Sequence, residues 1–329
     1  MEKIRAVISK QNPVVTGVLC TILGGIFWGF SAACGQYLFD HYNINSQWLT
    51  AVRMISAGSI LLLFAVLTQE KGNRKAVFSV FKEKKDLKAM VNFALTGLLL
   101  CQFSYLTAIQ YSNAGTATVL QYVGLVLVMI WVCMKERRAP HKKEMLAVGL
   151  ALAGTFLLTT HGNPGEMLIS KEGFFWGMIA AVGLATYTLV PTWILDKHGA
   201  ALISGWGMLI GGTVMAVAGK IWTVQVHLGF DGLLALSGIV IVGTVLAFTL
   251  YMVGVQNIGA LKASVIGCIE PVSAVVFTVL WFGAVFSPID IIAIVCIIST
   301  VFLLVRNDEP CAETDESIED NTETVGQTA

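Results

Sequence analysis

Apolar stretches of roughly 20 residues recur along the whole chain, separated by short polar segments. One helix of that length crosses the ~30 Å hydrocarbon core of a bilayer. The pattern predicts an all-α integral membrane fold of about ten spans, at 13–38, 46–68, 89–110, 114–134, 143–160, 173–195, 201–219, 232–255, 261–284 and 288–305. It lacks the short alternating segments of ~10 residues that are typical of a membrane β-barrel.

The composition agrees with a membrane protein and argues against a soluble domain, a nucleic-acid-binding protein and a metal-binding or disulfide-linked protein. Hydrophobic residues make up 56% of the chain and charged residues 13%, whereas soluble domains carry about 25% charged residues. The net charge of zero gives no reason to expect a nucleic-acid partner. Seven cysteines are scattered singly, which favours packing roles over disulfides or metal ligands. We therefore expect no cofactor and no metal.

The distribution of basic residues predicts the orientation. Of the 21 lysines and arginines, 18 fall on the side of the N-terminus if there are ten spans, with Lys171 and Lys220 opposite and Arg53 inside a span. The positive-inside rule then places both termini in the cytoplasm and the 161–172 loop outside. Residues 1–12 form a cytoplasmic segment, and the acidic stretch 306–329 is predicted to be a disordered cytoplasmic tail. The expected location is the inner or plasma membrane.

The sequence repeats itself. Gly-Ile-Phe-Trp-Gly at 25–29 returns as Gly-Phe-Phe-Trp-Gly at 173–177, which is 148 residues later. Five further residues, Tyr105, Gln110, Ala114, Ala117 and Thr118, return as Tyr251, Gln256, Ala260, Ala263 and Ser264, each 146 residues later. This predicts two related halves, 13–160 and 173–305, of five spans each. An odd number of spans inverts the second half, and inverted repeats are typical of secondary transporters.

The same residues carry a family resemblance. They are 24–29, Arg53, 105–109 running into 114–117, 120–122, 135–137 and the pair Glu270-Pro271. On them the chain resembles the EamA-type ten-helix branch of the drug/metabolite transporter superfamily. The resemblance implies transport of small organic solutes, more often by export than by import. Leu125 stands where that family has a proline and Ala284 where it has an acid, which puts the symmetry of the helix kinks in doubt.

Three charged residues inside or near spans are candidates for function. Glu270 lies ~15 Å from the start of its span, where a charge is costly unless it faces protein or water. Pro271 removes a helical hydrogen bond beside it and should kink the helix and free a carbonyl. Glu270 is thus the candidate for substrate binding and proton coupling, with a structural carboxylate as the alternative. Arg53, ~11 Å deep, and Lys262 are candidates for structural or gating charges.

The remaining substrate-binding candidates lie on helices that the repeat relates. Their side chains offer hydroxyls, amides and aromatic faces toward a central axis; they are Trp28, Gln102, Tyr105, Thr118, Gln121, Trp176, Thr244, Tyr251 and Ser264. The alternative is that these polar residues only join membrane helices. Two Gly-x-x-x-Gly pairs, at 25 and 29 and at 173 and 177, predict close helix packing within the chain or in a homodimer.

The leading functional hypothesis is a secondary transporter that moves small organic metabolites, such as amino acids or related solutes, across the cytoplasmic membrane by alternating access. Its partners would be a small-molecule substrate and the lipid bilayer. A membrane scaffold or receptor without transport is the first alternative, and an intramembrane enzyme is the second. No phosphate-binding Walker loop, HExxH or GxSxG motif occurs, so we predict that the chain is neither an enzyme nor an ATP-driven pump by itself.

Overall fold

The computed structural model describes residues 13–68, 74–112, 114–160, 162, 163, 165, 170–189, 192–282 and 288–305. The predicted terminal segments and Ala284 lie outside the described residues. Every regular element within these ranges is helical. The first half holds α2 (Pro13–His41), α3 (Ser46–Thr68), η1 (Arg74–Phe81), α4 (Lys84–Asn92), η2 (Phe93–Leu99), α5 (Leu100–Tyr111), α6 (Ala114–Tyr122), α7 (Gly124–Lys135) and α8 (Lys142–Thr160). The second half holds α9 (Lys171–Thr188), α10 (Thr192–His198), α11 (Ala200–Ala218), η4 (Ile221–Thr223), α12 (Phe230–Val240), η5 (Ile241–Leu246), α13 (Ala247–Ile258), α14 (Ala260–Ile266), α15 (Ile269–Phe282) and α16 (Pro288–Val305).

Several of these helices are built to cross a membrane. In the described part of the chain, 6 are long and apolar enough to do so: 13–41, 46–67, 84–111, 116–135, 200–218 and 230–258. The chain is therefore a multi-pass, all-helical membrane protein, as its sequence predicts. The other four predicted spans are not among these six, so the count of ten stays a prediction. The predicted span 173–195 does not form one helix, because α9 ends at Thr188 and α10 begins at Thr192.

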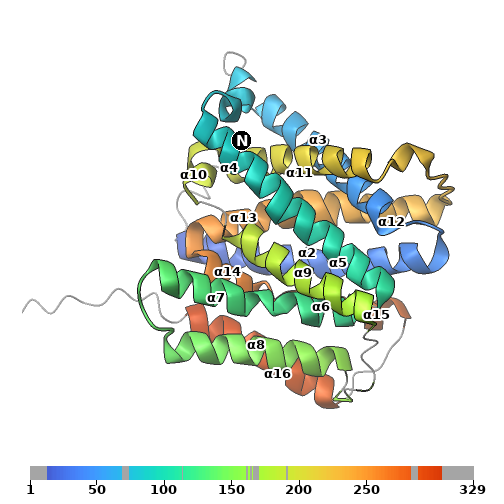
Figure 1. Ribbon diagram of the computed structural model, residues 1–329. Coiled ribbons are helices and arrows are strands. Elements are labelled where there is room, and N and C mark those ends of the chain that lie inside the picture. Colours follow the sequence, from blue (N-terminus) through green and yellow to red (C-terminus); the bar gives the residue numbers. More distant parts are fainter. Residues whose placement is uncertain are drawn as a thin grey trace, which may run out of the picture.

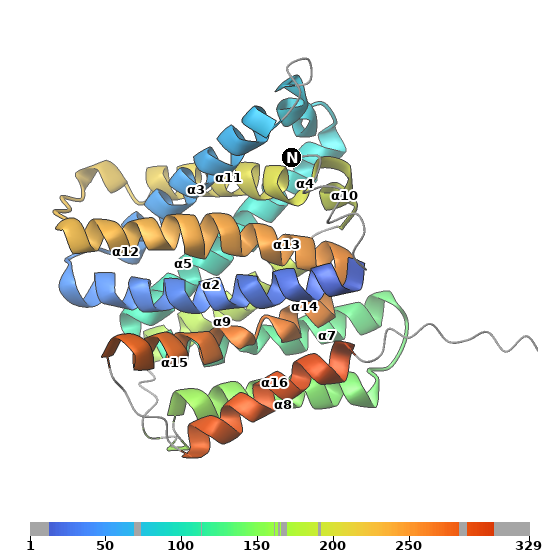
Figure 2. The same ribbon diagram turned by 180° about the vertical axis from the view of Figure 1, so that it is seen from behind.

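Helix α2 crosses the middle of the bundle (Figures 1 and 2). It packs mainly against α13 and α15, which both belong to the second half. In the same way α9 packs mainly against α5 and α6 of the first half. The other two main pairs are α3 with α11 and α8 with α16. Exchanging the halves turns most of these pairs into one another or into themselves: α2 with α13 corresponds to α9 with α5, and the pairs α3 with α11 and α8 with α16 are unchanged. The counterpart of α2 with α15 is the contact of α9 with α7. This agreement is what a two-fold related repeat predicts.

Irregularities in the helices also recur at matching positions. The π-helical segments η2 and η5 interrupt the third predicted span of each half. A break at Val123 separates α6 from α7, and a break at Gly267 and Cys268 separates α14 from α15. The kinks are therefore matched even though Leu125 replaces the proline of the family. Gly124 allows the first break to lie close to α9, because a Cβ atom there would be 2.5 Å from the Ala181 carbonyl oxygen.

The glycine face of α2 packs within the chain. Gly25 and Gly29 lie against the segment from Gly267 to Ser273. A Cβ atom at Gly29 would meet Ser273 Oγ and lie 2.5 Å from the Glu270 carbonyl oxygen. The close approach of α2 to α15 thus requires glycine at position 29 and fixes the start of α15, where Glu270 lies.

We expect Gly29→Ala to lower the thermal unfolding temperature, because α2 and α15 must separate to admit the methyl group. Overpacking of this kind costs about 1–3 kcal/mol. Gly149→Ala is the matched control, since a Cβ atom there meets nothing within 4 Å, and helix propensity favours alanine by up to ~1 kcal/mol. Thermal unfolding of both variants in detergent gives the comparison. Equal unfolding temperatures would contradict the tight contact of α2 with α15.

Candidate functional site

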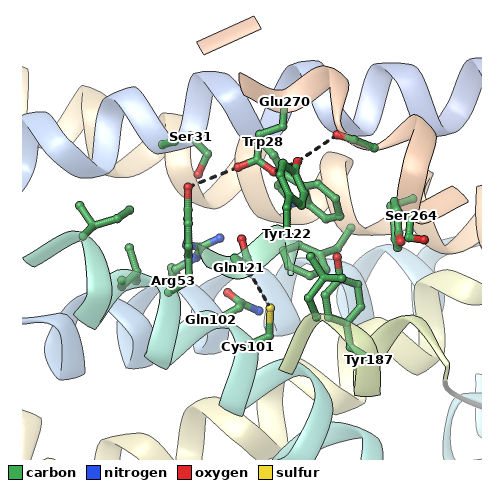
Figure 3. Close-up of a pocket in the computed structure, with 18 residues that line it drawn as sticks. Trp28, Ser31, Arg53, Cys101, Gln102, Gln121, Tyr122, Tyr187, Ser264 and Glu270 are labelled. Atoms are coloured by element: carbon green, nitrogen blue, oxygen red, sulfur yellow. Dashed lines mark hydrogen bonds between the residues drawn. The ribbon is translucent and has the colours of Figure 1, made fainter. Parts of the chain in front are cut away.

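A cavity lies where the two halves meet in the middle of the bundle (Figure 3). Side chains from α2, α3, α5 and α6 line it from the first half, and side chains from α9, α13, α14 and α15 line it from the second. Its volume is ≈ 50 Å³, which is small beside the ~300–1,000 Å³ of typical ligand pockets. The side chains have therefore closed around the cavity, and it must widen to admit a metabolite.

Glu270 lies at the broken turn between α14 and α15, and its side chain is buried. Pro271 lacks the N–H that would bond the Gly267 carbonyl four residues earlier. That carbonyl instead accepts a hydrogen bond from the Glu270 backbone N–H at 3.0 Å and one from Tyr122 Oη at 3.2 Å. Tyr122 Oη also donates to Glu270 Oε2 at 2.9 Å. The Gly267 carbonyl has lost its α-helical partner but is not free, because the Glu270 N–H takes that place. Tyr122 joins this carbonyl to the carboxyl group of Glu270.

The other carboxyl oxygen of Glu270 faces the first half. Tyr105 Oη donates to Glu270 Oε1 at 3.3 Å and lies 2.8 Å from Thr118 Oγ1. Thr118 Oγ1 in turn donates to the Ala114 carbonyl at 2.7 Å. Two phenol groups from the first half therefore hold the carboxyl group of the second half at the cavity wall. The arrangement can exchange a proton or accept a cationic group once the phenols move.

Arg53 brings a cation to the same cavity and is 5% exposed. Its Nε donates to Thr244 Oγ1 at 3.2 Å. Thr244 lies in η5, where its hydroxyl also bonds the Ile239 carbonyl five residues earlier. Within the described residues Arg53 makes no other hydrogen bond and no ion pair. Arg53 and Glu270 therefore line one cavity without forming an ion pair with each other.

Two further polar groups lack partners at the cavity. Among the described residues, neither amide atom of Gln102 nor the indole nitrogen of Trp28 finds a hydrogen bond. Both residues line the cavity, and Gln102 is only 3% exposed. Trp28 also packs on Phe248 and Tyr251, with ring centroids 4.9 Å and 4.8 Å away. Buried polar groups without partners are costly, so these groups are suited to a ligand or water.

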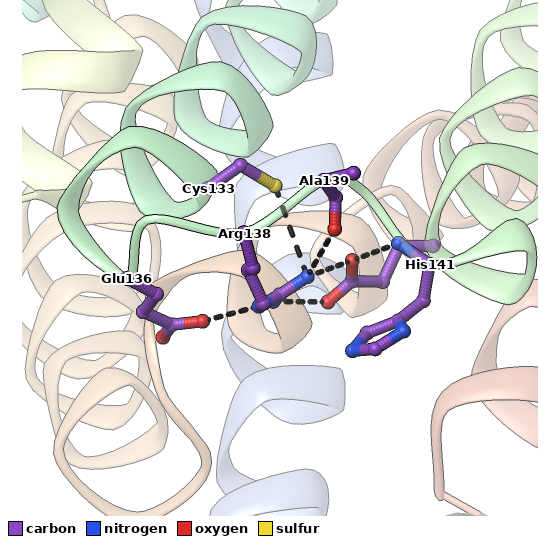
Figure 4. Close-up of polar contacts among 6 residues, drawn as sticks. Cys133, Glu136, Arg138, Ala139 and His141 are labelled. Atoms are coloured by element: carbon purple, nitrogen blue, oxygen red, sulfur yellow. Dashed lines mark hydrogen bonds and ion pairs between the residues drawn. The ribbon is translucent and has the colours of Figure 1, made fainter.

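A second, wider cavity lies between the α7–α8 connection and the α13–α14 junction. We call it the vestibule; its volume is ≈ 910 Å³, and its lining includes Lys135, Glu136, Arg138, His141, Lys142, Lys143, Glu144 and Lys262. Arg138 holds this wall together (Figure 4). It pairs with Glu144 at 2.7 Å and with Glu136 at 2.5 Å, and these carboxylates raise the pKa of Arg138 above its ordinary value. The wall is thus fixed and carries a net positive charge.

The linings of the vestibule and of the central cavity are in direct contact. Thr188 lines the vestibule, and its Oγ1 lies 3.1 Å from the hydroxyl of Tyr251, which lines the central cavity. The Tyr187 ring stands beside Tyr251, with centroids 5.6 Å apart. Thr188, Tyr187 and Tyr251 thus stand between the two spaces.

The structure gathers most of the predicted site residues. The cavity is lined by Trp28, Arg53, Gln102, Tyr105, Gln121, Tyr251, Ser264 and Glu270. Thr118 and Thr244 lie behind it and hold Tyr105 and Arg53. Lys262 lies at the vestibule instead. Trp176 is not brought to the cavity but packs on Phe103, because it lies five residues from the start of α9 and Trp28 lies in the middle of α2.

Several lining residues were not among the predicted candidates. Tyr122 lies next to Gln121 in the resemblance motif, and Ser31 follows Trp28 by three residues on the same helix face. Tyr187 takes the place expected for Trp176: it is 11 residues further along α9, about three turns deeper on the same face. Helical spacing from the candidates could have found these three, whereas the approach of Phe248 to Trp28 depends on the folded structure.

Known membrane transporters are similar to this chain along most of its length. The sequence profile of the EamA-like transporter family matches twice, at residues 15–160 and 171–306. The uncharacterized inner membrane transporter YicL of Salmonella typhimurium is 35% identical over 88% of this chain and 94% of its own length. The uncharacterized transporter YetK of Bacillus subtilis is 26% identical over 86% and 85%. A crystal structure of another protein has the same fold, with a TM-score of 0.70 and 16% identity over 88% of this chain and 95% of that chain.

Proposed function

Because the chain belongs to the EamA-like transporter family, we propose that it is a secondary transporter that exports small organic metabolites, amino acids or related solutes, across the cytoplasmic membrane by alternating access. The central cavity is the proposed substrate site, and Glu270 is the proposed proton carrier. Both termini lie in the cytoplasm in this proposal. A homodimer stays a prediction.

The arrangement of the helices supports ten passes in two inverted halves. The segments that connect the helices contact one another at two ends of the bundle. At one end Lys197 pairs with Glu83, and at the other Ser170 Oγ donates to the Tyr111 carbonyl. Two pseudo-symmetric halves can rock between states of similar energy that open to opposite sides. The orientation itself is testable, because Asn163→Cys should react with an impermeant reagent on intact cells.

The observation that carries the proposed solute class is the pair of opposite charges in one cavity. Arg53 is held by Thr244 and Glu270 by two tyrosines, and within the described residues the two charged groups make no ion pair with each other. A buried charge needs a partner. A solute with both a carboxylate and an ammonium group would supply one to each. The unpartnered amide of Gln102 and the indole of Trp28 could bind the rest of the polar headgroup.

Ligand binding by the purified protein tests this function. We expect zwitterionic amino acids to raise the thermal unfolding temperature, since a ligand at 100 times its Kd stabilises by about 2.7 kcal/mol. Two matched ligands are the controls: the amino acid amide lacks the carboxylate, and the N-acetyl acid lacks the ammonium group. Stabilisation by neutral solutes alone would refute the zwitterion assignment. If no solute class binds and none crosses proteoliposomes, the transporter proposal itself fails.

A further inference from the structure

An aspartate lies at the start of the third predicted span in each half. Asp86 is in the first turn of α4 and Asp231 in the first turn of α12. They are 145 residues apart, close to the 146 residues that relate Tyr105 to Tyr251. Each of the two helices continues into a π-helical segment, η2 or η5. The two aspartates are therefore counterparts in the repeat.

The contacts of Asp86 join the first half to the second. Its side chain is 1% exposed, and its Oδ2 lies 2.8 Å from both Lys197 Nζ and His198 Nε2. Lys197 also pairs with Glu83 at 2.7 Å, and His198 Nδ1 lies 2.9 Å from Ser79 Oγ. The carboxylates of Asp86 and Glu83 raise the pKa of Lys197, which therefore keeps its charge. Because Lys197 and His198 lie in α10, this cluster links α4 to the other half.

Asp231 of the second half contacts two tyrosines of the first half. Its Oδ1 accepts a hydrogen bond from Tyr42 Oη at 2.9 Å, and its Oδ2 accepts one from Tyr37 Oη. Tyr37 lies in α2 and Tyr42 directly follows it. We call Asp86 with Lys197 and His198 the inner latch, and Asp231 with Tyr37 and Tyr42 the outer latch.

The two latches lie at opposite ends of the bundle. The helix formed by α4, η2 and α5 is continuous from 84 to 111, with Asp86 near its start. Near its end Gln110 accepts a hydrogen bond from the Ser46 backbone, which is close to Tyr42 in the chain. The distance along this helix is about 36 Å at 1.5 Å per residue. Figure 1 likewise shows α4 and α10 at one end of the molecule and the start of α12 at the other.

We propose that the inner latch closes the cytoplasmic side of the central cavity and the outer latch closes the external side, so that each opens in turn. This inference rests on the alternating access proposed above. Both latches cross between the halves, so a rocking movement of one half against the other must separate one of them. Both are formed here, in agreement with the small central cavity. A change that weakens one latch shifts the population toward the state open on that side.

Labelling of a single cysteine tests the latches without any substrate. Cys101 lines the central cavity and is 3% exposed, so it serves as reporter when it is the only cysteine left. Right-side-out and inside-out membrane vesicles are treated with an impermeant maleimide. We expect Asp86→Asn to speed labelling from the cytoplasmic face and slow it from the external face, and Asp231→Asn to do the reverse. A shift of about tenfold corresponds to ~1.4 kcal/mol, close to the lower end of the ~1.5–3 kcal/mol that one hydrogen bond to a charged group contributes.

Two other aspartates are matched controls. Asp196 bonds Gln256 of its own half at 2.6 Å, and Asp40 bonds only Gln36 of its own helix among the described residues. Asn at either position should leave both labelling rates unchanged. If Asp86→Asn or Asp231→Asn does not reach the membrane, His198→Gln or Tyr42→Phe takes its place. Unchanged rates in the latch variants, or shifts in the same direction for both, would overturn the proposal. Because no solute is needed, failure of the latches is separate from failure of the transport assays.

Discussion

Glu270→Gln should abolish proton-driven accumulation of the solute while the protein still inserts into the membrane. A proton moving down a gradient of one pH unit provides about 1.4 kcal/mol, which sustains about tenfold accumulation of a solute exchanged one for one. Glutamine keeps the size of the side chain and its bonds to Tyr105 and Tyr122, but it cannot take up or release a proton. The measurement is solute accumulation in proteoliposomes with and without a pH difference.

The matched control is Glu172→Gln, because this glutamate lies exposed in the first turn of α9. It should accumulate solute as the unmodified protein does. Tyr122→Phe removes one bond to Glu270 and should lower the rate without abolishing the response to the gradient. Full proton-driven accumulation in Glu270→Gln would return Glu270 to a structural role as a carboxyl group that only holds helices together.

Local patterns in the sequence predict much of this fold. Apolar length predicts where the membrane helices lie, and the repeat predicts which of them should be related. The break beside Pro271 also follows from local chemistry, because a residue without an N–H cannot make the helical bond to the carbonyl four residues earlier. Even the unexpected break at Val123 has a local signal in the glycine that follows it, which allows α9 to come within contact distance.

Contacts between distant segments could not be predicted in the same way. Arg53 and Thr244 are 191 residues apart, and their contact depends on the wide turn of η5. Trp176 is the repeat partner of Trp28 by sequence, yet its depth in α9 differs, so Tyr187 reaches the cavity in its place. The contacts that form the two latches likewise join segments far apart in the sequence. In each case the residue type is in the sequence, but its partner is determined by the packing of the halves.

The opposite charges of Arg53 and Glu270 divide the proposed site into two ends with different roles. A solute that occupies both ends would neutralise both charges. In the structure, the Glu270 carboxyl group is hydrogen-bonded only by Tyr105 and Tyr122, and the Arg53 side chain only by Thr244, within the described residues. Binding of the solute or of a proton at Glu270 would therefore change the same group of contacts between the halves. This competition is a physical basis for exchange of the solute against protons, since both cannot occupy the carboxylate at once.

Arg53→Gln should weaken binding of carboxylate-bearing solutes about ten- to hundredfold. A hydrogen bond to a charged group contributes about 1.5–3 kcal/mol, and each ~1.4 kcal/mol is a factor of ten in Kd. Glutamine can still bond Thr244, so the helices should stay in place. Arg53→Lys keeps the charge but loses the planar fork that binds a carboxylate through two nitrogens, and we expect it to bind with intermediate affinity.

The sharpest readout is the ratio of Kd values for an amino acid and its amide, measured by calorimetry on each variant. The unmodified protein should prefer the acid, because only the carboxylate can pair with the guanidinium group. In Arg53→Gln that preference should disappear, while the amide binds both proteins equally. Loss of affinity for acid and amide alike would show instead that Arg53 supports the shape of the cavity, since a structural role does not distinguish the two ligands. The preference therefore separates recognition of the solute by Arg53 from its contact with Thr244.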